Sequence, residues 1–269
     1  MTSMKNPSVS IGFPVYNSAG IIVDALDSIL SQSFEDFELV ISDNASTDNT
    51  ESICREYALK DSRVRYIRQA ENIGMIANFK QVLELARGEY FMWHAGDDRK
   101  DPVFLELSIR VLRESAEIGL VFCDTEIVDL LSMEKFGDAS FGFTTSKIKW
   151  FKYLFRLHQG GGPALMYGLH RTELLSQFDL RSFDYFDLHL SHWYELNSQI
   201  SVIPLKLHVV GSEGRRIAYS LTGERLDPSA YLTAQWRLLT THFNIAVSAM
   251  LFGLAYYRVK RDCRNSMKP

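Results

Sequence analysis

The sequence predicts an α/β fold in which helices cover both faces of a mostly parallel sheet. Three observations support this prediction. Strand-like and helix-like segments alternate over about the first 125 residues, the connections between them are short, and 46% of the 269 residues are hydrophobic. Strands and helices that alternate in this way favour parallel strand pairing, because each helix carries the chain back to the start of the next strand. The hydrophobic fraction is sufficient for a large buried core.

Five short apolar runs have the composition of buried strands, and the segments between them repeat apolar side chains at helical spacing. The first run ends at Pro14, and the third helical segment ends at Gly88, a residue type that favours helix termination. In chain order, we expect strands over 9–13, 37–41, 64–67, 90–93 and 120–123, and helices over 22–30, 50–60, 76–86 and 105–112.

The alternation stops after Asp124. We expect an irregular stretch over 125–160 and a sharp turn at Gly160-Gly-Gly-Pro163. We interpret the whole chain as one domain, with a first half over about 8–125, a second half over about 126–216 and a helical tail over about 229–262. In the later part we expect helices over 172–177, 187–196 and 231–257, and short strands over 200–203 and 205–210.

Charge and cysteine content exclude several classes of protein. The chain has 29 Lys and Arg against 33 Asp and Glu, a net charge of −4, whereas general nucleic-acid binding needs a basic surface. The three cysteines form no CxxC pair, which argues against a zinc site or a disulfide framework. No signal peptide or spanning apolar run is evident, so we expect a cytoplasmic protein.

Three polar clusters follow predicted strands, namely Pro14-Val-Tyr-Asn17, Asp43-Asn-Ala-Ser-Thr-Asp48 and Ala95-Gly-Asp-Asp98. Parallel strands place such clusters at one edge of the sheet, where α/β proteins bind ligands. Gathered carboxylates repel one another unless a cation or hydrogen-bond donors are present. The alternative is that these residues only cap helices or form turns. Because no glycine-rich phosphate loop is present, bound phosphates would need a metal.

These motifs resemble family 2 inverting glycosyltransferases of the GT-A fold. The resemblance rests on 9–17 and 37–50, on Asn72-Ile-Gly74, and on Arg87-Gly-Glu-Tyr90 leading into Asp97-Asp98. It implies transfer of a hexosyl or deoxyhexosyl group from a nucleotide diphosphate sugar to a glycan or lipid-linked acceptor, with Mg or Mn, in cell-surface polysaccharide or glycolipid synthesis. It also makes the first half the nucleotide-sugar half and the second the acceptor half.

The resemblance assigns roles to residues at the predicted rim. Pro14, Tyr16 and Asn17 would line the nucleotide pocket, and Asp43 with Asn44 would contact the base or ribose. Asp97 matches the metal-binding end of the D-x-D motif, in which Ala95 replaces the first Asp. Asp98 would be a second metal ligand or a support for the loop.

The remaining catalytic roles fall in the second half. Asp187 is the best match to the base that deprotonates the acceptor, with Asp184 in reserve, although Asp187 could instead cap its helix. His208 and the loop carrying Arg215 and Arg216 are candidates for holding the diphosphate; the alternative is a solvated basic turn.

Two further alternatives remain open. The apolar segment from Phe243 to Tyr257 precedes a basic run, so it would be a membrane-surface helix at the inner face, or a helix packed on the domain or on a second copy. The loss of the first Asp at Ala95 leaves room for a non-catalytic nucleotide-sugar-binding or scaffold protein of the same fold. A sugar-phosphate nucleotidyltransferase is disfavoured because the first strand ends without a glycine-rich loop.

Overall fold

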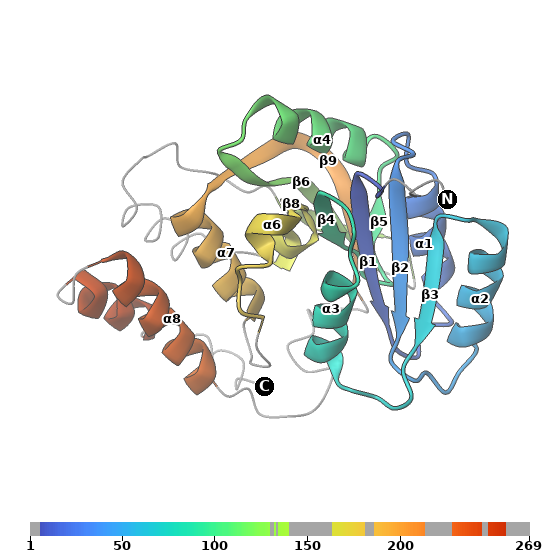
Figure 1. Ribbon diagram of the computed structural model, residues 1–269, viewed down its shortest axis with the longest axis horizontal. Helices are drawn as coiled ribbons and strands as arrows, with labels where there is room; N and C mark the ends of the chain where they lie inside the picture. The colour runs from blue at the N-terminus through green and yellow to red at the C-terminus, as the bar shows by residue number, and fades with distance from the viewer. Residues whose placement is uncertain are drawn as a thin grey trace.

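The computed structural model describes residues 6–129, 132, 134–139, 163–180, 186–212, 228–243 and 247–256. Within these residues the strands form one nine-stranded sheet with helices on both faces (Figure 1). The fold class is therefore α/β, as the sequence predicts. No helix in these ranges is both long enough and apolar enough to cross a bilayer.

The first four major strands form a parallel block. In sheet order they are β3 (Val64–Arg68), β2 (Phe37–Asp43), β1 (Val9–Val15) and β4 (Tyr90–Trp93). Val15 lies opposite Asp43, and Gly12 lies opposite Trp93, so the three strands that precede the polar clusters end at the same edge. The predicted strands over 9–13, 37–41, 64–67 and 90–93 are confirmed.

The second half of the sheet is mixed. It continues through β8 (Leu169–Arg171), β6 (Ile118–Asp129), β9 (Gln199–Ser212) and β5 (Arg99–Lys100), while β7 (Lys135–Ala139) pairs with β6. Among the described residues of this half, only the β6–β9 pair is parallel, and the pairs β4–β8, β6–β8, β5–β9 and β6–β7 are antiparallel. The expectation of a mostly parallel sheet therefore holds for the first block alone.

Two hydrophobic clusters lie on opposite faces of the sheet. Apolar side chains of α1 (Ile22–Leu30), α2 (Thr50–Lys60) and α4 (Phe104–Glu114) pack against alternate residues of β1 and β2. The other face is covered by α3 (Met75–Glu84), a 3-10 helix η1 (Pro163–Tyr167), α6 (Thr172–Leu175) and α7 (Phe186–Asn197). On this face Gly12 leaves room for Val82, which would come within 2.7 Å of an added Cβ atom.

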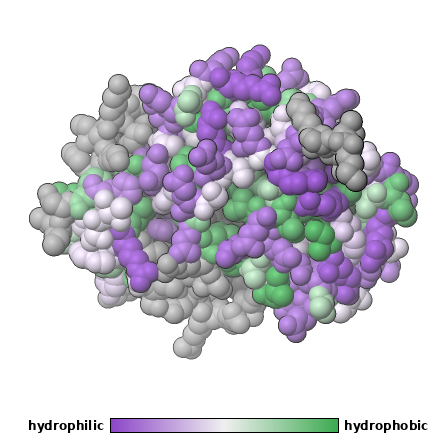
Figure 2. All heavy atoms as spheres, viewed as in Figure 1, coloured by the Kyte–Doolittle hydropathy of each residue, from purple (hydrophilic) through white to green (hydrophobic). Residues whose placement is uncertain are grey.

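The helical tail packs on the second half through α8 (Pro228–His242), which contacts α7. A further helical segment over 247–256 contributes Leu251 and Ala255 to a third cluster with Leu196, Leu238 and Leu239. In Figure 1 these helices are the orange-red and red ribbons beside α7. On the face shown in Figure 2, hydrophilic residues surround several smaller hydrophobic patches.

Three local expectations were wrong. Residues 125–129 and 135–139 are not irregular, because β6 continues to Asp129 and pairs with β7. Residues 140–162, which include the rest of the predicted irregular stretch and most of the predicted turn at 160–163, lie outside the described residues. Residues 199–212 form one long strand rather than two, since the chain crosses Pro204 at a register shift and continues beside β6. The helix expected over 231–257 begins earlier, at Pro228, and 244–246 lie outside the described residues.

Candidate active site

The three polar clusters meet at the carboxyl edge of the parallel block. Residues 15–19 and 44–50 are joined by a set of short hydrogen bonds. The Asn17 amide N–H donates to Ser46 Oγ at 3.0 Å, and the Asn17 Oδ1 accepts from the Thr47 amide N–H at 2.8 Å. These bonds fix the loop after β1 against the loop after β2, and Tyr16 is left 46% exposed beside them.

Both loops contain a residue in the left-handed region of backbone space. The φ angle is 49° at Asn17 and 61° at Ala45. Asparagine tolerates this conformation, whereas an alanine in it costs about 1–2 kcal/mol. The network around Ser46 therefore holds a turn that alanine alone does not favour.

Asp43 ends β2 with a fully buried carboxylate. The Tyr66 hydroxyl donates to its Oδ2 at 2.7 Å, and the Ser46 amide N–H donates to its Oδ1 at 2.8 Å. Arg68 Nε lies 3.9 Å from Oδ2. Burial and the hydrogen bond to Asp43 raise the pKa of Tyr66, so the phenol keeps its proton and remains a donor.

Asn44 is also buried, and both ends of its amide are used within the protein. Its Nδ2 donates to Asn72 Oδ1 at 2.8 Å, and its Oδ1 accepts from the Ile73 amide N–H at 2.8 Å. Asn44 thus joins the loop after β2 to the segment Asn72-Ile-Gly74. The predicted contact of Asp43 and Asn44 with a base or ribose stays a prediction, and in this structure both residues lie beneath the rim.

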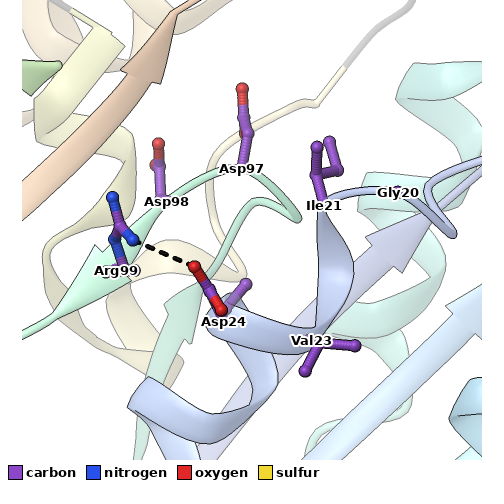
Figure 3. Close-up of a pocket in the computed structure, with 8 residues that line it drawn as sticks. Gly20, Ile21, Val23, Asp24, Asp97, Asp98 and Arg99 are labelled. Atoms are coloured by element: carbon purple, nitrogen blue, oxygen red, sulfur yellow. Dashed lines mark hydrogen bonds and ion pairs between the residues drawn. The ribbon is translucent and has the colours of Figure 1, made fainter. Parts of the chain in front are cut away.

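Asp97 and Asp98 differ sharply in their surroundings, although they are neighbours in sequence. Both project from the loop after β4 and line a shallow hollow with Gly20, Asp24 and Arg99 (Figure 3). Asp97 is partly exposed, whereas Asp98 is only 2% exposed. The Arg99–Asp24 ion pair, at 3.0 Å, closes one side of this hollow.

The Asp98 carboxylate is bound to the end of β9. His208 Nε2 lies 2.9 Å from Asp98 Oδ2, and the Gly211 amide N–H donates to Oδ1 at 3.3 Å. Burial raises the pKa of Asp98 to about 7, and burial lowers the pKa of His208. Both oxygens of Asp98 are thus engaged by the protein, which fits the role of a loop support.

Lys100 and His94 complete the buried polar layer beneath this loop. The Lys100 ammonium donates to the Tyr167 carbonyl oxygen at 2.9 Å, and burial lowers its pKa to about 8. His94 stacks on Phe13, and both of its ring nitrogens are buried with no hydrogen-bond partner among the described residues. Burial holds the pKa of His94 well below its ordinary value, so the ring is neutral.

The sequence did not indicate these partners. Asp98 and His208 are 110 positions apart, and Asp43 and Tyr66 are 23 apart, with no motif that joins them. His208, a candidate for holding the diphosphate, is 1% exposed, and its Nε2 lies 2.9 Å from Asp98 Oδ2. The pairing of β5 with β9, which brings Lys100 opposite His208, is the structural cause.

Several predicted residues cannot be placed at the rim. Asp184, Arg215 and Arg216 lie outside the described residues. Asp187 is the second residue of α7, as expected for a residue that opens a helix, but its side chain is not among those described. Their predicted roles stay predictions. Across the described ranges, no three His, Cys, Asp or Glu side chains gather closely enough to hold a metal by themselves.

A comparison with protein families decides the assignment. The model described as "Glycosyl transferase family 2" matches residues 10–163, more than half of the chain. The chain belongs to glycosyltransferase family 2. The matched range contains all three clusters at the rim, which confirms the resemblance noted in the sequence.

Similar proteins include a glycosyltransferase and a chondroitin synthase. EpsE of Bacillus subtilis, a protein assigned to the glycosyltransferases, is 35% identical over 118 residues, which are 44% of this chain and 42% of EpsE. Chondroitin synthase of Escherichia coli is 33% identical over 128 residues, which are 48% of this chain and 18% of that protein. The chain therefore spans less than half the length of these relatives.

Solved structures share the GT-A fold. Staphylococcus aureus TarS in complex with UDP-GlcNAc superposes with a TM-score of 0.68 at 18% identity, over 93% of this chain and 72% of that one. Mannosyltransferase PcManGT of Pyrobaculum calidifontis, in complex with GDP-Man and Mn2+, gives 0.57 at 19% identity, over 94% and 70%. At these identities the likeness establishes the fold.

Proposed function

We propose that this family 2 protein is an inverting glycosyltransferase that moves a hexosyl or deoxyhexosyl group from a nucleotide diphosphate sugar to an acceptor hydroxyl. The acceptor is a glycan or a lipid-linked glycan, and the setting is cell-surface polysaccharide or glycolipid synthesis on the cytoplasmic side. One observation carries the proposal. Asp97 is partly exposed at the rim in the D-x-D position, while its neighbour Asp98 is fixed behind it by His208.

The donor would lie across the ends of β1, β2 and β4. Tyr16 offers an exposed aromatic face, and Pro14 and Asn17 shape the adjoining loop. Asp43 and Asn44 would contact the base or ribose from below the rim. To do so, each would exchange one of its internal hydrogen bonds for a hydrogen bond to the donor. The similar proteins TarS and PcManGT, in complex with UDP-GlcNAc and GDP-Man, support a nucleotide diphosphate sugar as the donor class.

A divalent metal fits the residues present. Mg2+ and Mn2+ bind through one or two carboxylates when substrate phosphates supply the other oxygen ligands. Asp97 offers a partly exposed carboxylate, Ala95 offers none, and the Asp98 carboxylate is buried against His208. We therefore assign metal binding to Asp97 and reduce Asp98 to the support of its loop. The metal, when bound, neutralises charge on the departing diphosphate.

The chain's own residues supply the remaining steps. The acceptor oxygen attacks the anomeric carbon while the bond from that carbon to the diphosphate oxygen breaks, so the configuration inverts. Asp187, at the start of α7, takes the proton from the acceptor hydroxyl. Arg215 and Arg216 follow β9 in sequence and would bind the diphosphate as it leaves.

Transfer and donor hydrolysis assays with Mn2+ test the proposal. We expect Asp97→Ala to lower the rate at least about 100-fold, whereas Asp36→Ala, a carboxylate at the opposite end of the sheet, should leave it unchanged. NMR of the product should show the anomeric configuration opposite to that of the donor. Full activity of Asp97→Ala would overturn the metal assignment, and retained configuration would overturn inversion.

The absence of a carboxylate at Ala95 favours one competing function, a non-catalytic nucleotide-sugar-binding protein. The same assays separate the two. Donor binding with neither hydrolysis nor transfer to any glycan acceptor would assign the chain to the competing class.

A further inference from the structure

The helical segment over 247–256 has an unusual outer face. Its inner side is formed by Ser248, Leu251 and Ala255, all fully buried. Its outer side presents Met250 at 53% exposure and Leu254 at 45%, one helical turn apart. No charged residue occurs anywhere from Phe243 to Tyr257. A surface helix normally carries polar or charged residues on its solvent side, so an uncharged outer face indicates a surface that another apolar phase covers.

The charge of the chain is distributed unevenly around this helix. The last twelve residues contain five cations, Arg258, Lys260, Arg261, Arg264 and Lys268, and one anion, Asp262, which gives +4. Since the whole chain has a net charge of −4, the first 257 residues together carry −8. An exposed apolar helix face followed directly by a cationic run is complementary to an anionic lipid surface, which offers apolar chains beneath acidic headgroups.

We propose that the outer face of the 247–256 helix is a membrane-docking surface, whose partner is a bilayer containing anionic lipid. Met250 and Leu254 enter the boundary between headgroups and acyl chains, and the cationic run that follows binds the headgroups. A second copy of the chain fits this face less well. The three large exposed side chains of this segment, Met250, Leu254 and Tyr256, cover far less than the roughly 1,200 Å² of a stable protein interface.

Vesicle flotation tests the proposal with the full chain, and it is independent of catalysis. We expect binding to vesicles of phosphatidylcholine that contain roughly 30% phosphatidylglycerol, which imitates the negative charge of a cytoplasmic leaflet. We expect little binding to vesicles of phosphatidylcholine alone. Met250→Gln combined with Leu254→Gln should weaken binding about tenfold. Arg258→Gln combined with Arg261→Gln should weaken it about fivefold per residue, and added salt should do the same.

Leu59→Gln is the matched control, because Leu59 is a leucine with 89% exposure on α2 and no cationic run beside it. It should bind vesicles like the wild type, and all variants should melt like the wild type and hydrolyse donor at its rate. Failure of the wild type to bind anionic vesicles, or equal binding by the Met250 and Leu254 variant, overturns the proposal. A dimer in light scattering that this variant abolishes, without vesicle binding, would assign the face to a second copy.

Discussion

At the residue scale, the buried carboxylate of Glu38 explains the structural role of Arg87 and Gly88. Glu38 is 4% exposed at the amino end of β2. Ser10 donates to its Oε1 at 2.6 Å, and Arg87 donates to its Oε2 at 2.5 Å. The Gly88 amide N–H donates to Ser10 Oγ at 2.8 Å. This part of the family motif therefore holds β1, β2 and β4 together at the end of the sheet away from the rim.

Gly88 is required by close approach of the backbone. A Cβ atom there would lie 2.5 Å from the Ser10 nitrogen and 2.7 Å from the Val9 carbonyl carbon. Main-chain atoms cannot move aside as the end of a flexible side chain can. We therefore expect Gly88→Ala to lower the free energy of unfolding by about 3 kcal/mol. Gly20→Ala, whose added Cβ atom would meet no atom of the described residues within 4 Å, is the control for urea unfolding. Equal losses in both variants would contradict this account.

The ion pair of Glu38 should make stability depend on pH. Burial alone would raise the pKa of Glu38, but hydrogen bonds from Arg87 and Ser10 and the charge of Arg65 outweigh it and hold the pKa below its ordinary 4.5. Its contribution is therefore complete above pH 4.5 and is lost as the pH falls through the lowered pKa.

Glu38→Gln tests this dependence in urea titrations at several pH values. At pH 7 we expect the free energy of unfolding of the variant to be about 1–3 kcal/mol lower than that of the wild type. On acidification, the free energy of unfolding of the variant should fall less than that of the wild type. Glu56→Gln, whose pair with Lys60 on α2 is solvent-exposed, should keep the wild-type midpoint and pH profile. A Glu38→Gln profile parallel to that of the wild type would contradict the assignment.

Sequence reasoning at this scale finds residue types but not their partners. Asp97 and Asp98 are adjacent in the motif and cannot be distinguished from the sequence. In the structure, however, only Asp98 is buried against His208. Asn17 and Asn44 both hold loops together through their own amides, which a motif alone cannot distinguish from ligand contact. These differences arise from strand pairings between distant segments, which leave no local signal.

At the element scale, strands with continuous apolar runs were predictable, whereas the two-residue strand β5 and the three-residue strand β8 were not. β1, β2 and β4 are buried along almost their whole length, so their sequences are largely apolar. β5 has two residues, Arg99 and Lys100, and exists because β9 lies beside it. A strand of this kind is defined by its partner, and β5 directly follows the loop that carries Asp97 and Asp98.

The contact between β5 and β9 can be tested through His208. Removing the imidazole leaves the buried Asp98 without its side-chain partner, so His208→Ala should lower the free energy of unfolding by about 2–4 kcal/mol. His208→Gln should recover part of this loss, because its amide can donate to Asp98. His242→Ala, on the partly exposed end of α8, should cost less than about 1 kcal/mol in the same urea experiment. A small loss in His208→Ala would mean that Asp98 needs no partner.

At the scale of the whole molecule, the rim depends on both halves of the sheet. The loops after β1, β2 and β4 come from the parallel block, whereas the support of Asp98 comes from β9 in the mixed block. Composition and motifs predicted the first block well because its strands and helices are local and periodic. The second block could not be predicted equally well, since β6, β8 and β9 pair across separations that periodicity does not encode.

Because the proposed donor site draws on both blocks, donor binding should stabilise the chain as a unit. A nucleotide diphosphate sugar with Mn2+ at 100 times its Kd should add about 2.7 kcal/mol, or roughly 5 °C or more in Tm. Donor without metal should give a smaller shift, and Asp97→Asn should lose the metal-dependent part while melting like the wild type without ligand. A screen of uridine and guanosine donors by thermal shift also identifies the base. If Asp97→Asn kept the full shift with Mn2+, the metal would have to bind elsewhere, and the assignment of Asp97 would fail even though donor binding itself stood.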